Sequence, residues 1–200
     1  MKKPKDEKMG VERIADVNFP TKYGIFRLYA FKDGQGGEHL ALVNGKCDGT
    51  TMVRVHSKCV TGDIFSSMRC DCRAQLEQAL ELIGKEKNGV LIYLDQEGRG
   101  IGLSNKIRAY ELQDGGMDTV DANLELGFAE DLRDYESAAE ILKILGLKTI
   151  KLITNNPKKV NAMKEYGIEV AERIPLEIKS NRYNEKYLKT KKERLGHILE

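Results

Sequence analysis

The 200-residue chain contains no tryptophan, four prolines and four cysteines, and it has almost no excess of charge of either sign. Its 33 basic and 31 acidic residues leave a net charge of +2, so bulk charge does not indicate a nucleic-acid coat protein. The charged N-terminus has no apolar signal-peptide core, and no apolar run is long enough to span a membrane. We therefore expect a protein of the reducing cytoplasm, with neither a membrane anchor nor a nucleic-acid partner.

The chain is long enough to bury a substantial core within one domain. We expect residues 1–10 to form a flexible N-terminus, because chain ends are poorly ordered unless they are tied down. No repeat or low-complexity linker interrupts residues 11–200, which we predict to be a single catalytic domain.

The order of the expected elements predicts an α/β fold. Apolar–polar alternation indicates strands within residues 21–56, interrupted by a glycine-rich turn at residues 33–37. Helices and strands then alternate, which favours a layered α/β/α domain around a mixed sheet with an antiparallel N-terminal portion. The expected helices lie at residues 76–83, 105–112, 137–145, 158–166 and 184–195, and the later strands at residues 89–94, 149–153 and from 168 onward.

Cys59, Cys70 and Cys72 form a C-x10-C-x-C pattern flanked by basic residues. A structural zinc site normally has four protein ligands, whereas a catalytic site has three and keeps one position open. Basic neighbours favour thiolates, so the pattern indicates a metal that takes part in chemistry. The alternatives are three scattered core cysteines or a disulfide. Cys47 is a candidate fourth ligand, although a free thiol is favoured there.

Residues 95–103, DQEGRGIGL, follow an expected strand and precede an expected helix, where α/β proteins bind ligands. Three alternating glycines allow close backbone approach, and Arg99 adds a cation. Glu97 can accept hydrogen bonds from the N1–H and N2 amino edge of a guanine. Leu103 breaks the G-x-G-x-x-G pattern, which excludes a Rossmann dinucleotide site. An ordinary glycine-rich turn is the alternative.

Two further segments are weaker candidates. Residues 154–159, TNNPKK, join a strand end to a helix start, which suits a phosphate or carbonyl contact, although a well-capped helix with surface lysines is commoner. In residues 129–135, Asp131 and Arg133 would point apart on a helix but share a side in an extended segment or a turn, where they could serve one substrate. Taken alone, the charge pattern of residues 129–135 most often indicates a solvent-exposed face.

Taken together, RVHSKC, RCDC, DQEGRGIGL, KIRAYELQD and TNNPKK resemble GTP cyclohydrolase II from about Arg54 to Pro175. The resemblance implies a homodimeric hydrolase, dependent on zinc and magnesium, that opens the imidazole ring of GTP at C8. It would release formate and pyrophosphate and leave 2,5-diamino-6-(5-phosphoribosylamino)pyrimidin-4(3H)-one, in the first step of riboflavin synthesis. The chain resembles the stand-alone form, because it has no room for the dihydroxybutanone-phosphate synthase domain often fused to this enzyme.

The resemblance also implies roles for individual residues. Cys59, Cys70 and Cys72 would hold one zinc ion per subunit, and Mg²⁺ would bind with the triphosphate of GTP. Lys58 departs from the family pattern, since an acidic residue is frequent there. The positions that match GTP contacts are Arg54, Val55, His56, Ser57, Lys58, Gln75, Glu97, Gly98, Arg99, Thr119, Thr154 and Lys159.

Three more residues match catalytic positions of the family. Asp131 matches the proton acceptor, and Tyr110 matches a tyrosine close to the reacting ring. Arg133 matches a proposed nucleophile toward the α-phosphate. Because a guanidinium stays protonated, electrostatic stabilisation of that phosphate is the simpler role, and we leave the role of Arg133 open.

Other functions remain as alternatives at this point. A relative of the enzyme could open the ring and stop at the formamide, although Tyr110 argues against it. A non-catalytic, zinc-stabilised nucleotide- or RNA-binding module would be favoured by a fourth protein ligand such as Cys47. A zinc nucleobase deaminase is disfavoured, because its H-x-E…P-C-x-x-C signature is missing.

Overall fold

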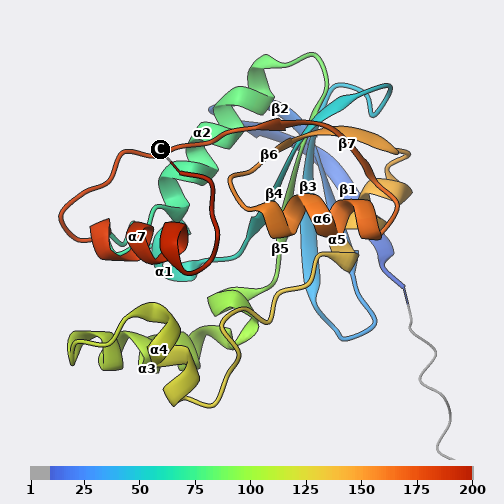
Figure 1. Ribbon diagram of the computed structural model, residues 1–200. Helices are drawn as coiled ribbons and strands as arrows, with labels where there is room; N and C mark the ends of the chain where they lie inside the picture. Colours follow the sequence, from blue (N-terminus) through green and yellow to red (C-terminus); the bar gives the residue numbers. More distant parts are fainter. Residues whose placement is uncertain (1–9, 200) are drawn as a thin grey trace, which may run out of the picture.

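The computed structural model describes residues 10–199, so the predicted flexible N-terminus lies, except for Gly10, outside the described residues. One seven-stranded sheet has the order β1-β2-β3-β5-β4-β6-β7 (Figure 1). The strands from β1 to β3 and the β3–β5 pair are antiparallel, whereas β5, β4, β6 and β7 run parallel. This confirms the mixed sheet with its antiparallel N-terminal portion. The strands are Glu12–Thr21 (β1), Gly24–Lys32 (β2), Glu38–Asn44 (β3), Thr51–Ser57 (β4), Gly89–Leu94 (β5), Thr149–Ile153 (β6) and Glu169–Ile174 (β7).

Helices cover both faces of the sheet, as the sequence predicts. The larger core cluster joins one sheet face to α5 (Glu136–Ile144) and α6 (Pro157–Glu165). On the other face, α2 (Cys72–Lys85) packs Ala79 and Ile83 against a smaller cluster (Figure 1). Central strands buried on both faces explain the continuous apolar run of β5.

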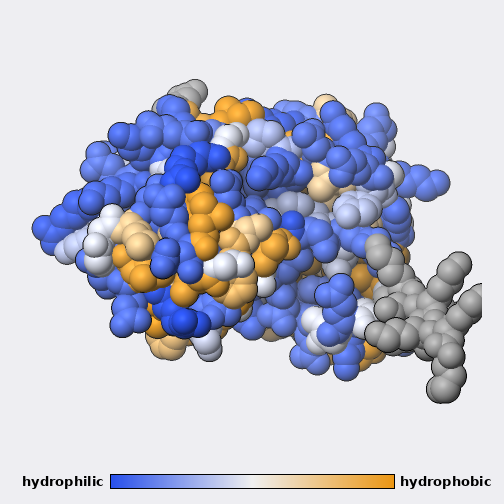
Figure 2. Space-filling view, turned by 60° about the horizontal axis from the view of Figure 1, so that its bottom comes forward, coloured by the Kyte–Doolittle hydropathy of each residue, from blue (hydrophilic) through white to orange (hydrophobic). Residues whose placement is uncertain are grey.

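The remaining elements lie beyond the sheet. They are α1 (Val60–Asp63), the 3₁₀ turn η1 (Glu97–Gly100), α3 (Gly102–Asp114), α4 (Thr119–Glu125) and α7 (Glu185–Glu193). α3 and α4 contact each other and project from one end of the sheet (Figure 1). Apolar side chains gather on that side of the molecule (Figure 2), where Leu103, Ile107, Met117, Leu124 and Leu132 are exposed.

The sequence reasoning missed β1, and it also missed α1 and α4. β1 is an edge strand whose residues are almost all exposed, so no buried face imposes a regular apolar–polar alternation on it. Its strand conformation comes from antiparallel pairing with β2, for example Asn18 opposite Arg27. Among the described residues, we find no helix with the length and apolarity needed to cross a membrane.

Parallel pairing decides where the sequence motifs meet. β4 lies between β5 and β6, so the carboxyl ends of these three strands form one edge of the sheet. β4 leads into the first cysteine, β5 into the glycine-rich segment and β6 into TNNPKK. Such an edge is where open α/β sheets bind their ligands.

Candidate metal centre and nucleotide pocket

The three cysteines of the C-x10-C-x-C pattern converge. Their Sγ atoms all lie within 4.8 Å of one another, and those of Cys59 and Cys70 are 3.9 Å apart. A tetrahedral zinc site with Zn–S bonds of about 2.3 Å requires sulfur atoms about 3.8 Å apart. Within the described part of the chain, no His, Asp, Glu or fourth Cys joins this cluster. The donor set therefore fits a zinc ion with three protein ligands.

Gly62 in α1 makes room for the sulfur atoms. A Cβ at this position would lie 2.9 Å from Cys70 Sγ and 3.1 Å from Cys59 Sγ. Both distances are too short for ordinary packing, so α1 can approach the three thiols only with glycine at this position.

Asp63 fixes the backbone at the first cysteine. Its carboxylate accepts hydrogen bonds from the Cys59 N–H at 2.9 Å and the Tyr93 hydroxyl at 2.8 Å. It is also hydrogen-bonded to His56 Nε2 at 3.1 Å. His56 stacks on Tyr93, and burial lowers the pKa of this histidine below its ordinary value. The His56 side chain thus supports the cysteine segment through Asp63.

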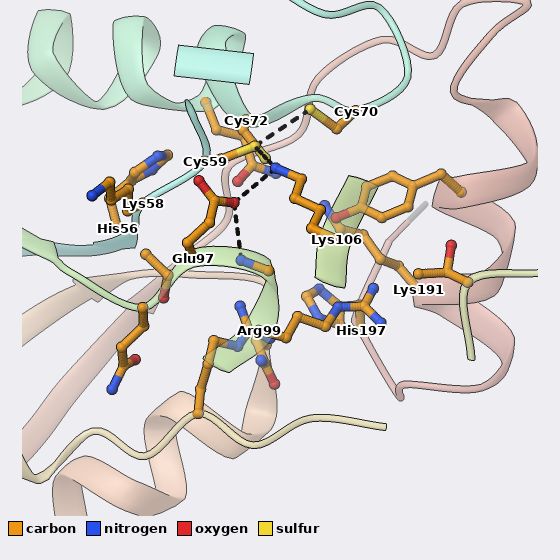
Figure 3. Close-up of a pocket in the computed structure, with 18 of the residues that line it drawn as sticks. His56, Lys58, Cys59, Cys70, Cys72, Glu97, Arg99, Lys106, Lys191 and His197 are labelled. Atoms are coloured by element: carbon orange, nitrogen blue, oxygen red, sulfur yellow. Dashed lines mark hydrogen bonds and ion pairs between the residues drawn. The ribbon is translucent and has the colours of Figure 1, made fainter. Parts of the chain in front are cut away.

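Lys106 of α3 joins the thiol cluster to the glycine-rich segment (Figure 3). Its Nζ lies 3.1 Å from Cys59 Sγ and 2.8 Å from Glu97 Oε1. The pKa of Cys59 is lowered because the other two thiols donate hydrogen bonds to its sulfur and because the Lys106 ammonium lies beside it. Cys59 is therefore the thiol most readily present as a thiolate metal ligand.

Cys47 lies elsewhere. It packs, half-buried, against the larger core cluster and does not belong to the group of three thiols. Burial raises the pKa of this thiol above its usual value. The expectation of a free thiol at Cys47 is confirmed, which removes the sequence argument for a closed four-ligand site.

A pocket opens beside the sulfur atoms at the carboxyl edge of the sheet. Of the site residues that the sequence predicts, all line this pocket except Val55 and Asp131. The Val55 side chain belongs to the core, and its carbonyl oxygen accepts a hydrogen bond from Lys159 Nζ at 2.7 Å. Val55 thus reaches the pocket only through its backbone carbonyl, which contacts the pocket residue Lys159.

Asp131 and Arg133 lie in a non-helical segment, in which the Arg133 N–H donates to Asp131 Oδ1 at 3.1 Å and the two side chains share a side. Arg133 donates from Nε to Oδ1 at 2.8 Å and from Nη2 to Oδ2 at 2.6 Å of the Asp131 carboxylate. Burial alone would raise the pKa of Asp131, but the Arg133 guanidinium outweighs it and holds that pKa below its usual range. The ionised Asp131 therefore orients Arg133, which faces the pocket.

Buried cations dominate the part of the pocket near β4 and β6. Arg54 donates to the Gln75 side chain at 2.7 Å and to the Ile153 carbonyl at 3.0 Å, and burial lowers its pKa to about 10. Burial, followed by the charges of Arg54 and Arg133, places the pKa of Lys159 well below its ordinary value. This crowding of positive charge favours an anionic ligand.

Arg99 is held in an unusual backbone conformation. Its φ is 61° and that of the preceding Gly98 is 63°, which is left-handed backbone that side chains other than glycine seldom adopt. Both terminal guanidinium nitrogens of Arg99 are buried without a hydrogen-bond partner among the described residues. An oriented cation of this kind is available to a ligand in the pocket.

The other predicted residues take varied positions around the pocket. The Tyr110 hydroxyl is 3.3 Å from Thr61 Oγ1, next to the thiols, and burial raises the pKa of Tyr110 to about 12. Lys58 pairs with Asp95 at 2.9 Å, so the departure from the family pattern leaves its side chain engaged outside the thiol cluster. Ser57 and Gly98 line the pocket, as do Thr119 at the first turn of α4 and Thr154 after β6.

Several pocket residues were missed by sequence reasoning. Lys106 carried a usable signal, because it stands four residues before Tyr110 and shares its helix face. No comparable signal marked the residues contributed by the C-terminal region, since they lie far from every motif. The additional charged or polar lining residues include Arg69, Lys106, Asn123, Asn155, Tyr187, Lys191 and His197.

Fold and site together define a layered α/β protein in which three thiols that could hold a metal ion lie beside a cationic pocket. A family model described as GTP cyclohydrolase II matches residues 12–175. The chain belongs to the GTP cyclohydrolase II family.

The chain is similar to several known proteins over most of its length. It is 52% identical over 194 residues to the GTP cyclohydrolase-2 of Shewanella amazonensis, covering 96% of this chain and 95% of that protein. It is 53% identical over 192 residues to the riboflavin biosynthesis protein RibBA of Endomicrobium trichonymphae, covering 94% of this chain and 48% of the relative. The chain thus spans about half the length of its RibBA relatives.

A solved structure of RibBX, a two-domain 3,4-dihydroxy-2-butanone 4-phosphate synthase from A. baumannii, is a more distant match. It has a TM-score of 0.46 and 24% identity, and the match covers 86% of this chain and 42% of that chain.

The thiol cluster leads to a first prediction about metal content. We expect Cys70→Ser to lose zinc while the fold largely survives, because two thiolates and a weak hydroxyl ligand hold zinc poorly. Zinc per chain is measured by mass spectrometry after dialysis, and circular dichroism follows the fold. Cys47→Ser is the matched control and should keep its zinc. Wild-type zinc content in Cys70→Ser would contradict a three-thiolate site.

Proposed function

We propose that this protein hydrolyses GTP in the cytoplasm as the first step of riboflavin synthesis. It would open the imidazole ring at C8, release formate and pyrophosphate, and leave 2,5-diamino-6-(5-phosphoribosylamino)pyrimidin-4(3H)-one. The observation that carries the proposal is the meeting of three thiols and several buried cations in one pocket. Family membership supports it.

Cys59, Cys70 and Cys72 would hold the zinc ion, with no fourth protein ligand in the cluster of the described residues. Zinc with an open position is a Lewis acid that acidifies a bound water at neutral pH. The chain's own contribution is to keep that position facing the pocket. Gly62 and Asp63 hold the first cysteine in place, and Lys106 offsets part of the negative charge of the thiolates.

Glu97 is our candidate for recognising the guanine base. Its carboxylate already accepts three hydrogen bonds, from the Val60 N–H, the Gly98 N–H and Lys106. A carboxylate offers about four acceptor positions, so one remains, on Oε2, for the N1–H or an N2 amino hydrogen of a guanine. The contacts that fix Glu97 also pre-orient it, since its side chain is almost wholly buried.

The triphosphate would lie among the cations on the β4 and β6 side of the pocket. Arg54, Lys159 and Arg133 come from three separate segments, and Arg99 reaches in from the glycine-rich turn. Mg²⁺ would arrive with the phosphate oxygens, as polyphosphate chemistry generally requires. Arg133, held charged and oriented by Asp131, suits electrostatic stabilisation at the α-phosphate.

Two residues are placed to handle the base during ring opening. The Tyr110 hydroxyl lies close to the thiols and stays protonated at neutral pH, because burial raises its pKa. It can therefore donate a hydrogen bond to a purine nitrogen when water adds at C8. Asp131 is ionised and can accept a proton. Because its carboxylate is hydrogen-bonded to Arg133, orienting the Arg133 guanidinium is its more direct role.

Zinc-loaded protein incubated with GTP and Mg²⁺ tests the function directly. We expect formate, pyrophosphate and the diaminopyrimidine to appear together, measured by a formate dehydrogenase assay, a pyrophosphatase-coupled assay and chromatography. Ring opening without formate would instead identify a relative that stops at the formamide. Bound zinc and bound GTP without any product would favour a non-catalytic nucleotide-binding module.

Substitution of Glu97 tests base recognition. We expect Glu97→Gln to lower the preference for GTP over ATP about tenfold to a hundredfold, because an amide replaces the charged acceptor that faces the guanine edge. The preference is measured as the ratio of kcat/KM values, with zinc content checked for each protein. Asp95→Asn, the same change two residues away on an exposed side chain, should leave the ratio unchanged. An unchanged ratio in Glu97→Gln would remove Glu97 from base recognition.

We infer a homodimer that packs through the side of the molecule carrying α3 and α4. Five large apolar side chains are exposed there, and such clustering marks interaction surfaces (Figure 2). We expect Leu124→Glu to convert the dimer to a monomer, because it would bury a charge at the interface. Light scattering after gel filtration measures the mass. Ile25→Glu, at an exposed position of β2, is the control, and a monomer in that variant alone would place the interface elsewhere.

A further inference from the structure

The C-terminal segment, residues 184–199, lies outside the part of the chain that the family model matches. It nevertheless supplies part of the pocket lining, from α7 and from the tail that follows it. The lining residues of this segment are Tyr187, Lys191, His197 and Leu199.

Three anchors hold the C-terminal segment against the site. Lys191 Nζ is 2.6 Å from Oδ1 of Asp71, the residue between two of the metal-ligand cysteines. Arg194 pairs with Asp118 at 2.5 Å, at the start of α4. The Ile198 N–H donates to the Asn155 carbonyl at 2.8 Å, just after β6. The segment therefore bridges α2, α4 and the sheet edge, and it closes one side of the pocket (Figures 1 and 3).

The Asp71 anchor belongs to a longer hydrogen-bonded chain. The second Asp71 oxygen accepts from Gln75 Nε2 at 2.6 Å, and Gln75 Oε1 accepts from Arg54 Nη2 at 2.7 Å. Lys191 is thus connected through two side chains to a predicted nucleotide-binding arginine. The Lys191 side chain is itself only 10% exposed, which is costly for an ammonium with a single carboxylate partner.

Positive charge is concentrated where the tail meets the pocket. Burial, followed by the charges of Lys191, Arg133, Lys159 and Arg99, lowers the pKa of His197 to about 3. Lys191 and Arg133 each have a carboxylate partner, whereas Lys159 and Arg99 have none among the described residues. The His197 ring likewise has no hydrogen-bond partner within the described chain. A neutral imidazole and four surrounding cations make a site for a polyanion.

We propose that the C-terminal segment is a wall of the nucleotide pocket, in which Lys191 and His197 bind the phosphate groups of the substrate. This inference rests on the proposed function for the identity of the nucleotide. Lys191 has ammonium hydrogens beyond the one given to Asp71, and the neutral His197 ring can donate its one N–H to a phosphate oxygen. A phosphate chain would thereby offset the charge that the protein leaves uncompensated.

A purely structural role is the competing explanation. Lys191 would then serve only to fix Asp71 and, through it, the cysteine segment. That role predicts loss of zinc or equal loss of affinity for every ligand, whereas phosphate binding predicts a loss that grows with the number of phosphates.

The test compares Lys191→Met with Lys189→Met. Lys189 lies on the same helix, but its side chain is 69% exposed and its partner is Glu193. Calorimetry on the zinc-loaded full chain measures the Kd of guanosine 5′-(α,β-methylene)triphosphate and of guanosine. We expect Lys191→Met to weaken triphosphate binding about tenfold to a hundredfold and guanosine binding less than about twofold, because only the charged contact is lost. Lys189→Met should match the wild type for both ligands.

His197→Gln provides a second variant near the chain end that leaves the Asp71 pair intact. It should weaken the triphosphate analogue several-fold with the same sparing of guanosine. Equal weakening of both ligands in both variants, or wild-type binding in both, would overturn the proposal. If GTP and ATP analogues bind alike and Lys191→Met weakens both, the phosphate site stands and the guanine-specific function fails.

Discussion

Parallel pairing of β4 with β5 on one side and β6 on the other is the constraint on which the site depends. Their carboxyl ends lie together because the register is continuous across the three strands. The cysteine segment, the glycine-rich turn and the segment after β6 are separated by up to about a hundred residues in sequence, yet they meet at this edge. Two buried clusters, one on each face, hold the sheet and with it the spacing of the pocket walls.

The site balances two kinds of charge. Three sulfur atoms and the Glu97 carboxylate lie at one end of the pocket, where Lys106 contacts both Cys59 and Glu97. Buried arginines and lysines lie on the β4 and β6 side of the pocket, and Arg54, Arg99 and Lys159 have no carboxylate partner among the described residues. Burying unpaired cations costs free energy, so their retention suits a site that a polyanionic ligand completes. The same side chains can thereby place a nucleotide with its base near the thiols and its phosphates near the cations.

Much of the fold was predictable because its signals are local. β5 and β6 were predicted with their observed bounds, since short apolar runs mark buried strands. α5 and α6 were predicted to within one residue, since one buried face imposes a helical periodicity. β1 gave no such signal, because an exposed edge strand is specified by its pairing partner. The geometry of Asp131 and Arg133 depended on whether residues 129–135 are helical, and the charge pattern fits a helix as well as the observed non-helical segment.

The sequence by itself determined the chemistry of the site: three thiols with no fourth ligand at metal spacing, a glycine-rich turn between strand and helix, and motifs that place the chain in its family. Only the tertiary structure decided that the Val55 side chain lies in the core, that Asp131 pairs with Arg133, and that Lys106, Lys191 and His197 line the pocket. Residue types and short spacings are encoded locally, whereas contacts across many tens of residues follow from strand order and helix packing. Neither of these can be read from any one segment.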